Sequence, residues 1–403
     1  MVILNRLLRE LIEKGGSDLH LSSERPPMFR VDGEMVNSSM STQSHAEVHE
    51  ILRGVMDTRA SDEFTECRDT DFAYEIKDLA RFRVNVFEDR YGMGGVFRQI
   101  PGEVLTAEKL GLPASVTDLC NLSKGLVLVT GPTGSGKSTT LAAMIDYINK
   151  RQSKHIITIE DPIEFVHQDK KCLINQRQIK DHTRSFSKAL RAALRQDPDI
   201  VMVGEMRDLE TIEIALETAE TGHLVFGTLH TTTAASTMDR IIDAFPANRQ
   251  NQIRSMLSNS LKAVIAQTLC KKTNGGRVAA LEILKVDFGM SALIRDGKIH
   301  QIPSAMQVGA AKGMVLLNNA LLSLVKTGTI EAEEAFLKAV DKESLLNTFK
   351  KENISTAFLS DATEAEPQNT TAAPPAQPVT YAIKKEPTPD KKKRTLFGKN
   401  GSH

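Results

Sequence analysis

The fold is decided by the stretch Gly131-Pro132-Thr133-Gly134-Ser135-Gly136-Lys137-Ser138-Thr139. It matches the phosphate-loop pattern G-x-x-x-x-G-K-S/T at every fixed position. The preceding segment 125–130 is apolar and β-branched, which predicts a buried strand, and 140–148 has apolar residues at helical spacing. Glycines in such a loop let backbone N–H groups turn toward phosphate oxygens beside the helix N-terminus. We therefore expect the loop to bind a nucleotide such as ATP, with Lys137 at the β- and γ-phosphates and the Ser138 hydroxyl on Mg²⁺.

Length and composition set the frame around this loop. A chain of 403 residues suggests two or three domains. Lysine plus arginine and aspartate plus glutamate each number 51, so no bulk charge favours nucleic acid or an anionic membrane as partner. No apolar run approaches the ~20 residues that span a bilayer, and the N-terminus has no signal-peptide core. We expect a cytoplasmic protein that does not insert into a membrane itself and meets the inner membrane only through partners.

The cysteines Cys67, Cys120, Cys172 and Cys270 are scattered and form no C-x-x-C pair. This pattern disfavours a zinc site or a disulfide framework and favours a reducing compartment.

The first hundred residues predict a small α+β domain, residues 1–100. An amphipathic helix over 3–12 precedes an alternating strand over 17–22. Asp32-Gly33 marks the tip of a hairpin. The remaining expected elements are a hairpin over 28–36, a helix over 46–55, and strands over 71–76, 81–87 and 94–100.

Three arginines in this domain are candidate anion contacts. Alternation in 81–87 places Arg81 and Arg83 on one face of a strand and apolar residues on the other. An ordinary solvated face is one interpretation. The other is that Arg81 and Arg83, together with Arg98, face an anion across a domain or subunit boundary.

A linker over 101–112 leads to the nucleotide domain, residues 113–346. A second core strand over 154–159 ends in Glu160-Asp161-Pro162-Ile163-Glu164. Carboxylates that follow a parallel strand lie at the edge of the sheet where ligands bind. We expect Glu160 and Asp161 near the nucleotide and Glu164 at the metal; an acidic cluster that only caps a helix is the alternative.

Two further strands carry the remaining candidates. The strand 200–203 ends in Gly204-Glu205, the Walker B position, where Glu205 is placed to orient or deprotonate the attacking water. Glycine at 204 means that carboxylates for the metal must come partly from the 160–164 cluster. The strand 223–230 ends in His230, which we expect to sense the γ-phosphate. His223, at its start, is a second nucleotide candidate, and a structural role remains open for both histidines.

These motifs carry a resemblance. Residues 131–139, 159–165, 197–211 and 221–231 resemble the Walker A, Asp box, Walker B and His box of the type II/IV secretion ATPase superfamily. Within it, the chain is most similar to the PilT-type retraction ATPases of type IV pili, from its N-terminus to about residue 345. The four-cysteine zinc insert of assembly ATPases is missing, which favours the retraction branch.

The resemblance implies a PAS-like N-terminal domain, a RecA-like ATPase domain, and a homohexameric ring that binds ATP and Mg²⁺ between domains. It implies that Arg81, Arg83 and Arg98 close over phosphate, and that hydrolysis drives pilus retraction through an inner-membrane platform protein. A paralogous retraction ATPase is a further expected partner. Gln178 stands where the family usually has glutamate. A secretion or assembly motor, and a non-hydrolysing nucleotide-dependent scaffold, remain the alternatives.

The extension 347–403 differs in composition. Residues 364–389 are rich in Pro, Ala, Thr and Gln, which predicts disorder. Residues 391–397 are basic with an apolar end, typical either of a solubilising tail or of a docking segment.

Overall fold

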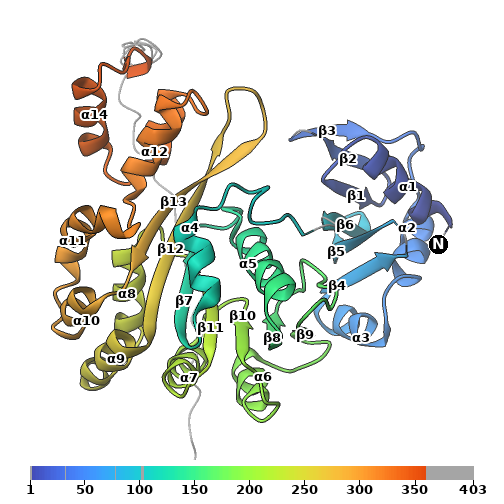
Figure 1. The fold of residues 1–403 in the computed structure, drawn as a ribbon. Helices are drawn as coiled ribbons and strands as arrows, with labels where there is room; N and C mark the ends of the chain where they lie inside the picture. Colours follow the sequence, from blue (N-terminus) through green and yellow to red (C-terminus); the bar gives the residue numbers. More distant parts are fainter. Residues whose placement is uncertain (1, 32, 78, 101–103, 360–403) are drawn as a thin grey trace, which may run out of the picture. The chain divides into compact units, whose positions relative to one another are not determined.

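The computed structural model describes residues 2–31, 33–77, 79–100 and 104–359. The described chain is built on two β-sheets (Figure 1), which confirms the expected α/β class. The predictions for Asp32, for the start of the linker at 101–103, and for the segments 364–389 and 391–397 lie outside the described residues. Among the described residues, none of the helices has the length and apolar character needed to cross a membrane.

The first sheet is antiparallel and belongs to the N-terminal domain. Its strand order is β3-β2-β1-β6-β5-β4. Alternation along the fifth strand buries Phe82, Val84 and Val86 completely, so one face of the sheet forms the core of this domain. The strands are β1 (Asp18–Ser22), β2 (Met28–Val31), β3 (Glu34–Asn37), β4 (Asp69–Ile76), β5 (Ala80–Asp89) and β6 (Gly92–Ile100).

Three helices, α1 (Val2–Glu13), α2 (His45–Arg53) and α3 (Thr58–Cys67), pack on that face. The sequence predicts the first two from their apolar spacing. It does not predict α3, because only Ala60 and Phe64 of this helix are buried. Helix α3 begins after Asp57, whose side chain accepts a hydrogen bond of 2.7 Å from the Ala60 N–H.

The second sheet has strand order β13-β12-β7-β11-β10-β8-β9 and is parallel except for its β13 edge. Its central strands are continuous apolar runs because helices cover both faces. The polar strand β9 and the long β12–β13 hairpin are additional to the strands that the sequence predicts. The strands are β7 (Gly125–Thr130), β8 (His155–Glu160), β9 (Leu173–Gln178), β10 (Ile200–Val203), β11 (Leu224–Leu229), β12 (Leu261–Lys271) and β13 (Arg277–Lys285).

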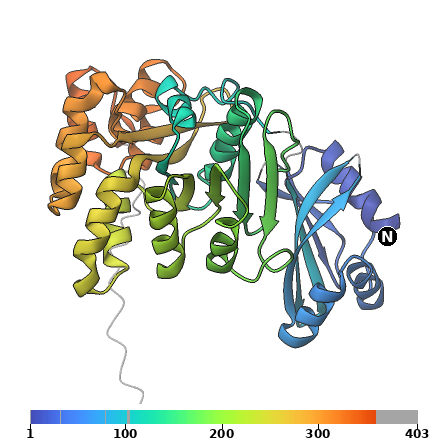
Figure 2. The ribbon, with the colours of Figure 1, turned by 60° about the horizontal axis from the view of Figure 1, so that its bottom comes forward.

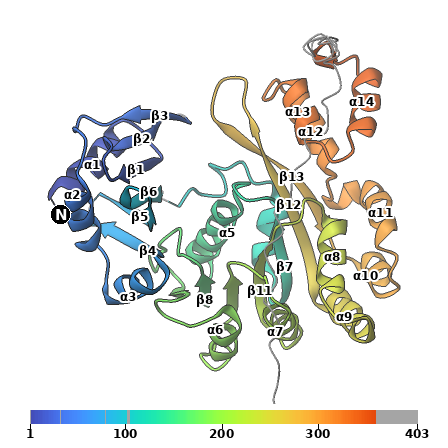
Figure 3. The ribbon, with the colours of Figure 1, turned by 180° about the vertical axis from the view of Figure 1, so that it is seen from behind.

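Helices lie on both sides of this sheet (Figure 2). One face packs against α5 (Lys137–Arg151) together with α4 (Ala114–Thr117) and the short η1 (Asp118–Asn121). The other face packs against a larger group, whose later members gather beside β12 and β13 in Figure 3. That group is α6 (Phe186–Ala193), α7 (Leu209–Glu220), α8 (Ala234–Asp243), α9 (Ala247–Ser260), α10 (Phe288–Arg295), η2 (Ile299–Gln301) and α11 (Ile302–Val308).

The end of the described chain is helical. After η3 (Gly309–Lys312), the helices α12 (Leu317–Lys326), α13 (Ala332–Lys338) and α14 (Lys342–Lys351) build a small core against the far part of the β12–β13 hairpin. The domain boundary expected at residue 346 falls inside α14, whose Phe349 is fully buried in that core.

Candidate active site

The phosphate loop joins β7 to α5 and needs its glycines. Gly131, Gly134 and Gly136 have φ angles of 144°, 77° and 89°, in the region that favours glycine. A Cβ at Gly131 would lie 2.3 Å from the backbone oxygen of Gln267. The loop is therefore pressed against β12, in a shape that a side chain at this position would prevent.

Gln267, only 3% exposed, braces this loop from β12. Its Nε2 donates a hydrogen bond to the Ser135 carbonyl at 2.5 Å, and its Oε1 accepts one from the Thr140 hydroxyl at 2.8 Å. One side chain thus ties the loop to the first turn of α5. Sequence reasoning missed this residue, although a glutamine inside the apolar run 263–269 is a signal that could have found it.

Lys137 begins α5 and folds back over the loop. Its Nζ donates to the carbonyl oxygens of Gly131 at 2.8 Å and Pro132 at 3.2 Å. Burial lowers the pKa of Lys137, and the negative charges of Glu205 and Glu164 oppose that shift. The loop lysine therefore lies within the electrostatic reach of both glutamates that the sequence singles out.

Glu205 follows β10 and is held by two partners. It accepts from Arg207 Nη2 at 2.6 Å and pairs with His230 Nε2, which follows β11, at 2.9 Å. Burial alone would raise the pKa of Glu205, but these hydrogen bonds and charges outweigh it and lower the pKa. The carboxylate is thus ionised and fixed at the carboxyl edge of the sheet, and Arg207 is a partner that sequence reasoning missed.

The acidic segment after β8 divides into a buried and an accessible part. Glu160 is 9% exposed and accepts from the Thr158 hydroxyl at 2.6 Å and from Gln176 Nε2 at 3.0 Å. Burial raises the pKa of Glu160 to about 7. Asp161 and Glu164 lie beyond it, along the wall of the cavity described next.

A cavity of about 610 Å³ joins these groups. It is bounded by the phosphate loop, by the ends of β8, β10 and β11, and by part of the N-terminal domain. The predicted site residues along its wall include Lys137, Ser138, Asp161, Glu164, Glu205 and His230.

The buried Glu160 gives a pH-dependent prediction. Its folded-state pKa lies above the ordinary value of 4.5, so its contribution to stability is complete below about pH 4.5 and is lost as the pH rises toward 7. Glu160→Gln can accept the same two hydrogen bonds without a buried charge. We therefore expect Glu160→Gln to gain stability relative to wild type between pH 5 and pH 8, by at most about 3 kcal/mol. This gain should appear as a rise in the melting temperature of the variant relative to that of wild type. Melting curves in EDTA without nucleotide measure this; an equal difference at both pH values would contradict it.

The three arginines occupy different positions. Arg83, on β5, lines the cavity. Arg81 donates from Nη2 to the Gln178 side chain at 3.3 Å. Arg98, opposite Arg83 in the sheet, instead pairs through Nε with the buried Asp18 at 2.8 Å and is not among the residues that line the cavity. Of the three arginines, Arg83 is thus the one that lines the cavity within one chain.

His223 lies away from the loop. It precedes β11, its backbone oxygen accepts from the Gly125 N–H at the start of β7, and its Nδ1 is 3.2 Å from the Thr218 oxygen. The loop follows the opposite end of β7, and a strand of six residues spans about 20 Å. Within one chain, His223 therefore lies at the edge of the sheet opposite the loop, because strand start and strand end lie at opposite edges of a parallel sheet. Its contact with the nucleotide stays a prediction.

The side chains that face the cavity suit Mg²⁺ held jointly with a nucleotide. The described residues contain no cluster of three or more His, Cys, Asp or Glu side chains that could cage a metal alone. Mg²⁺ usually keeps several waters and binds through one or two protein oxygens plus substrate phosphates. The Ser138 hydroxyl and the Glu164 carboxylate line the same cavity and are oxygen donors of this kind.

Similarity to known proteins extends over most of the chain. A family model described as type II/IV secretion system protein matches residues 1–343. The chain belongs to this family. The pilus retraction ATPase PilT of Pseudomonas aeruginosa is 53% identical over 336 residues, which cover 83% of this chain and 98% of that protein. The type IV pilus ATPase PilU of the same organism is 41% identical over 335 residues, 83% of this chain and 88% of PilU.

The fold of this chain is also that of a solved structure from the family. The crystal structure of the pilus retraction motor PilT with bound ADP superposes with a TM-score of 0.80 at 46% identity, over 85% of this chain and 98% of that one. The resemblance to PilT-type members of the secretion ATPase family, predicted from the four motifs, is confirmed.

Proposed function

We propose that this chain is an ATPase motor that couples ATP hydrolysis to the retraction of type IV pili. One observation carries the proposal: Lys137, Glu205 and His230 meet at the phosphate loop, in a chain that matches a pilus retraction ATPase over nearly all of that protein's length. A non-hydrolysing scaffold would not need a fixed, ionised carboxylate beside the loop lysine.

In this proposal the chemistry is positioning and charge stabilisation, as in other phosphoryl-transfer enzymes. Lys137 leaves the loop carbonyls and neutralises the β- and γ-phosphates. Glu205, kept ionised by Arg207, orients the attacking water and receives its proton, while His230 holds the other carboxylate oxygen. Ser138 and Glu164 would hold Mg²⁺, which supplies positive charge at the phosphate oxygens when bound.

The N-terminal domain completes the site by bringing Arg83 to the cavity. We infer a division into residues 1–100, a linker over 101–112, the ATPase domain from 113, and an extension from 347. The assembly we propose is a homohexamer in the cytoplasm, docked on an inner-membrane platform protein. A PilU-like paralogue is a further proposed partner, since PilU matches 83% of this chain over 88% of its own length.

Glu205→Gln separates binding from hydrolysis. The amide keeps size and hydrogen bonding but cannot accept the proton of the attacking water. We expect ATP to bind and the steady-state hydrolysis rate to fall by about 10²-fold or more. Glu164→Gln is the matched comparison, because Glu164 lines the same cavity. Normal hydrolysis by Glu205→Gln would move the role of base to Glu164.

Pilus retraction in a deletion strain tests the biological role. Loss of the gene should abolish retraction while pili are still made. Wild-type protein should restore it, and Glu205→Gln should not. A deletion strain without pili would instead identify an assembly motor.

A further inference from the structure

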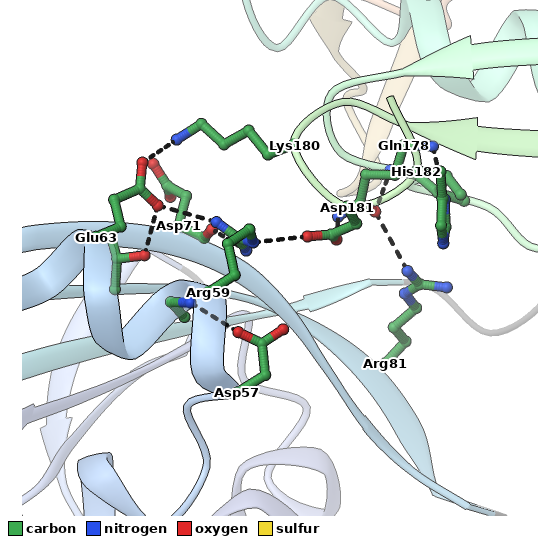
Figure 4. Close-up of polar contacts among 12 residues, drawn as sticks. Asp57, Arg59, Glu63, Asp71, Arg81, Gln178, Lys180, Asp181 and His182 are labelled. Atoms are coloured by element: carbon green, nitrogen blue, oxygen red, sulfur yellow. Dashed lines mark hydrogen bonds and ion pairs between the residues drawn. The ribbon is translucent and has the colours of Figure 1, made fainter. Parts of the chain in front are cut away.

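Gln178 ends strand β9, is 3% exposed, and makes polar contacts in three directions (Figure 4). Its Oε1 accepts from the Ile163 N–H at 3.1 Å and from Arg81 Nη2 at 3.3 Å. Its Nε2 donates to the carboxylate of Asp181. Both polar atoms of this buried amide group are therefore engaged.

The contacts of Gln178 connect the ATPase domain to the N-terminal domain. Ile163 lies in the turn between Asp161 and Glu164, so its N–H fixes the backbone that carries both carboxylates. Arg81 comes from β5 of the N-terminal domain. A single amide oxygen thus bridges the acidic turn of the ATPase domain and the arginine strand of the other domain.

The loop after β9 adds two ion pairs to helix α3 of the N-terminal domain (Figure 4). Arg59 Nε pairs with Asp181 at 2.9 Å, and Lys180 Nζ pairs with Glu63 at 2.6 Å. Both pairs are partly exposed, and such pairs contribute about 0–1 kcal/mol each. Because these ion pairs are weak, the N-terminal domain can separate from the loop after β9 at little cost. The contacts of the buried Gln178 are complete only when Arg81 and Asp181 are both in place.

We propose that Gln178 is a positioning residue that transmits docking of the N-terminal domain to the acidic turn carrying Asp161 and Glu164. This inference rests on the proposed ATPase function and adds a route by which the arginine domain controls it. When Arg81 and Asp181 engage the amide, the Ile163 backbone is held and Glu164 faces the cavity. When the domain leaves, the amide loses Arg81, Asp181 loses its ion pair with Arg59, and the turn relaxes.

The proposal depends on the amide being both donor and acceptor. A glutamate at 178 would still accept from Ile163 and Arg81, but a carboxylate has no N–H to give Asp181. Two carboxylates would instead face each other at hydrogen-bond distance, and like charges at that separation repel. Gln178→Glu therefore breaks one defined contact and keeps the other two.

The test uses the full chain, with steady-state ATP hydrolysis and the affinity for fluorescent ADP. Gln178→Glu should lower kcat by about 10-fold or more through misplacement of the turn, while the Kd for ADP changes little. Gln152→Ala is the matched control, because Gln152 is a partly buried glutamine that donates to the Cys120 carbonyl at 2.9 Å, at the other end of α5. The control should keep wild-type kcat.

A second variant distinguishes positioning from a merely structural role. Gln178→Glu combined with Asp181→Asn exchanges donor and acceptor, so the contact can form again in reverse. The double variant should recover most of the kcat that Gln178→Glu loses, and its melting temperature should return toward that of wild type. Wild-type kcat in Gln178→Glu, or a loss that the second change does not repair, would overturn the proposal. A wild type that hydrolyses no ATP would overturn the proposed function itself, which is a separate result.

Discussion

Lys137→Ala is expected to abolish ATP turnover and to weaken nucleotide binding strongly. The Nζ of Lys137 donates to the carbonyl oxygens of Gly131 and Pro132, and in the proposed function it turns from them to the β- and γ-phosphates. Its removal deletes the point charge that neutralises those phosphates. The carboxylates of Glu164 and Glu205 would then face the phosphates without a compensating cation, so binding should suffer as well as the rate.

Lys150→Ala is the matched control for this prediction. It removes a lysine from the last turn of the same helix, where Lys150 pairs with Asp146. Asp146 keeps a second partner, Lys170, so the control should fold and hydrolyse ATP normally. Steady-state ATPase activity and the affinity for ADP should be measured for both variants. If Lys137→Ala hydrolysed ATP at nearly the wild-type rate, the assignment of residues 131–139 as the catalytic nucleotide site would be wrong.

The sequence predicts which residues lie at the nucleotide-binding edge of the sheet, because those residues directly follow apolar strands. Runs such as 125–130 and 224–229 are buried on both faces, and a parallel sheet brings the ends of its strands to one edge. The order of motifs along the chain therefore suffices to place Lys137, Glu205 and His230 together. His223 stands at the start, not the end, of such a strand, so the same reasoning does not bring it to the loop within one chain, and its contact with the nucleotide stays a prediction.

Other features depend on contacts that no local pattern encodes. Strand β9 is polar and is a strand because β8 supplies its hydrogen-bond partners. The brace formed by Gln267 requires β12 to lie beside β7. Gln178 stands out in the sequence, but two of its partners, Ile163 and Arg81, are distant in the sequence and are brought to it only by the fold. Its third partner, Asp181, is three residues away.

Arg83→Ala is expected to leave the protein folded and able to bind ADP, yet severely slowed. Arg83 belongs to a domain without a phosphate loop and lines the same cavity as Lys137. An arginine that stabilises charge in the transition state is worth up to about 10³–10⁵ in kcat in phosphate-loop enzymes. Arg68→Ala is the control, because Arg68 lies in the same domain in an exposed pair with Glu88. Arg98→Ala is a poorer test, since it would leave the buried Asp18 without its ion-pair partner.

Mixing inactive chains decides which nucleotide site Arg83 serves. If hexamers form, the specific activity of wild type should rise with protein concentration. Arg83→Ala keeps an intact loop, and Lys137→Ala keeps an intact arginine. Because Arg83 lines the cavity of its own chain, we expect mixed rings of these two variants to stay inactive. Recovery on mixing would show that the arginine reaches the site of a neighbouring subunit, and that closure within one chain is not the working arrangement. Full activity of Arg83→Ala alone, at every concentration, would remove the N-terminal domain from the chemistry.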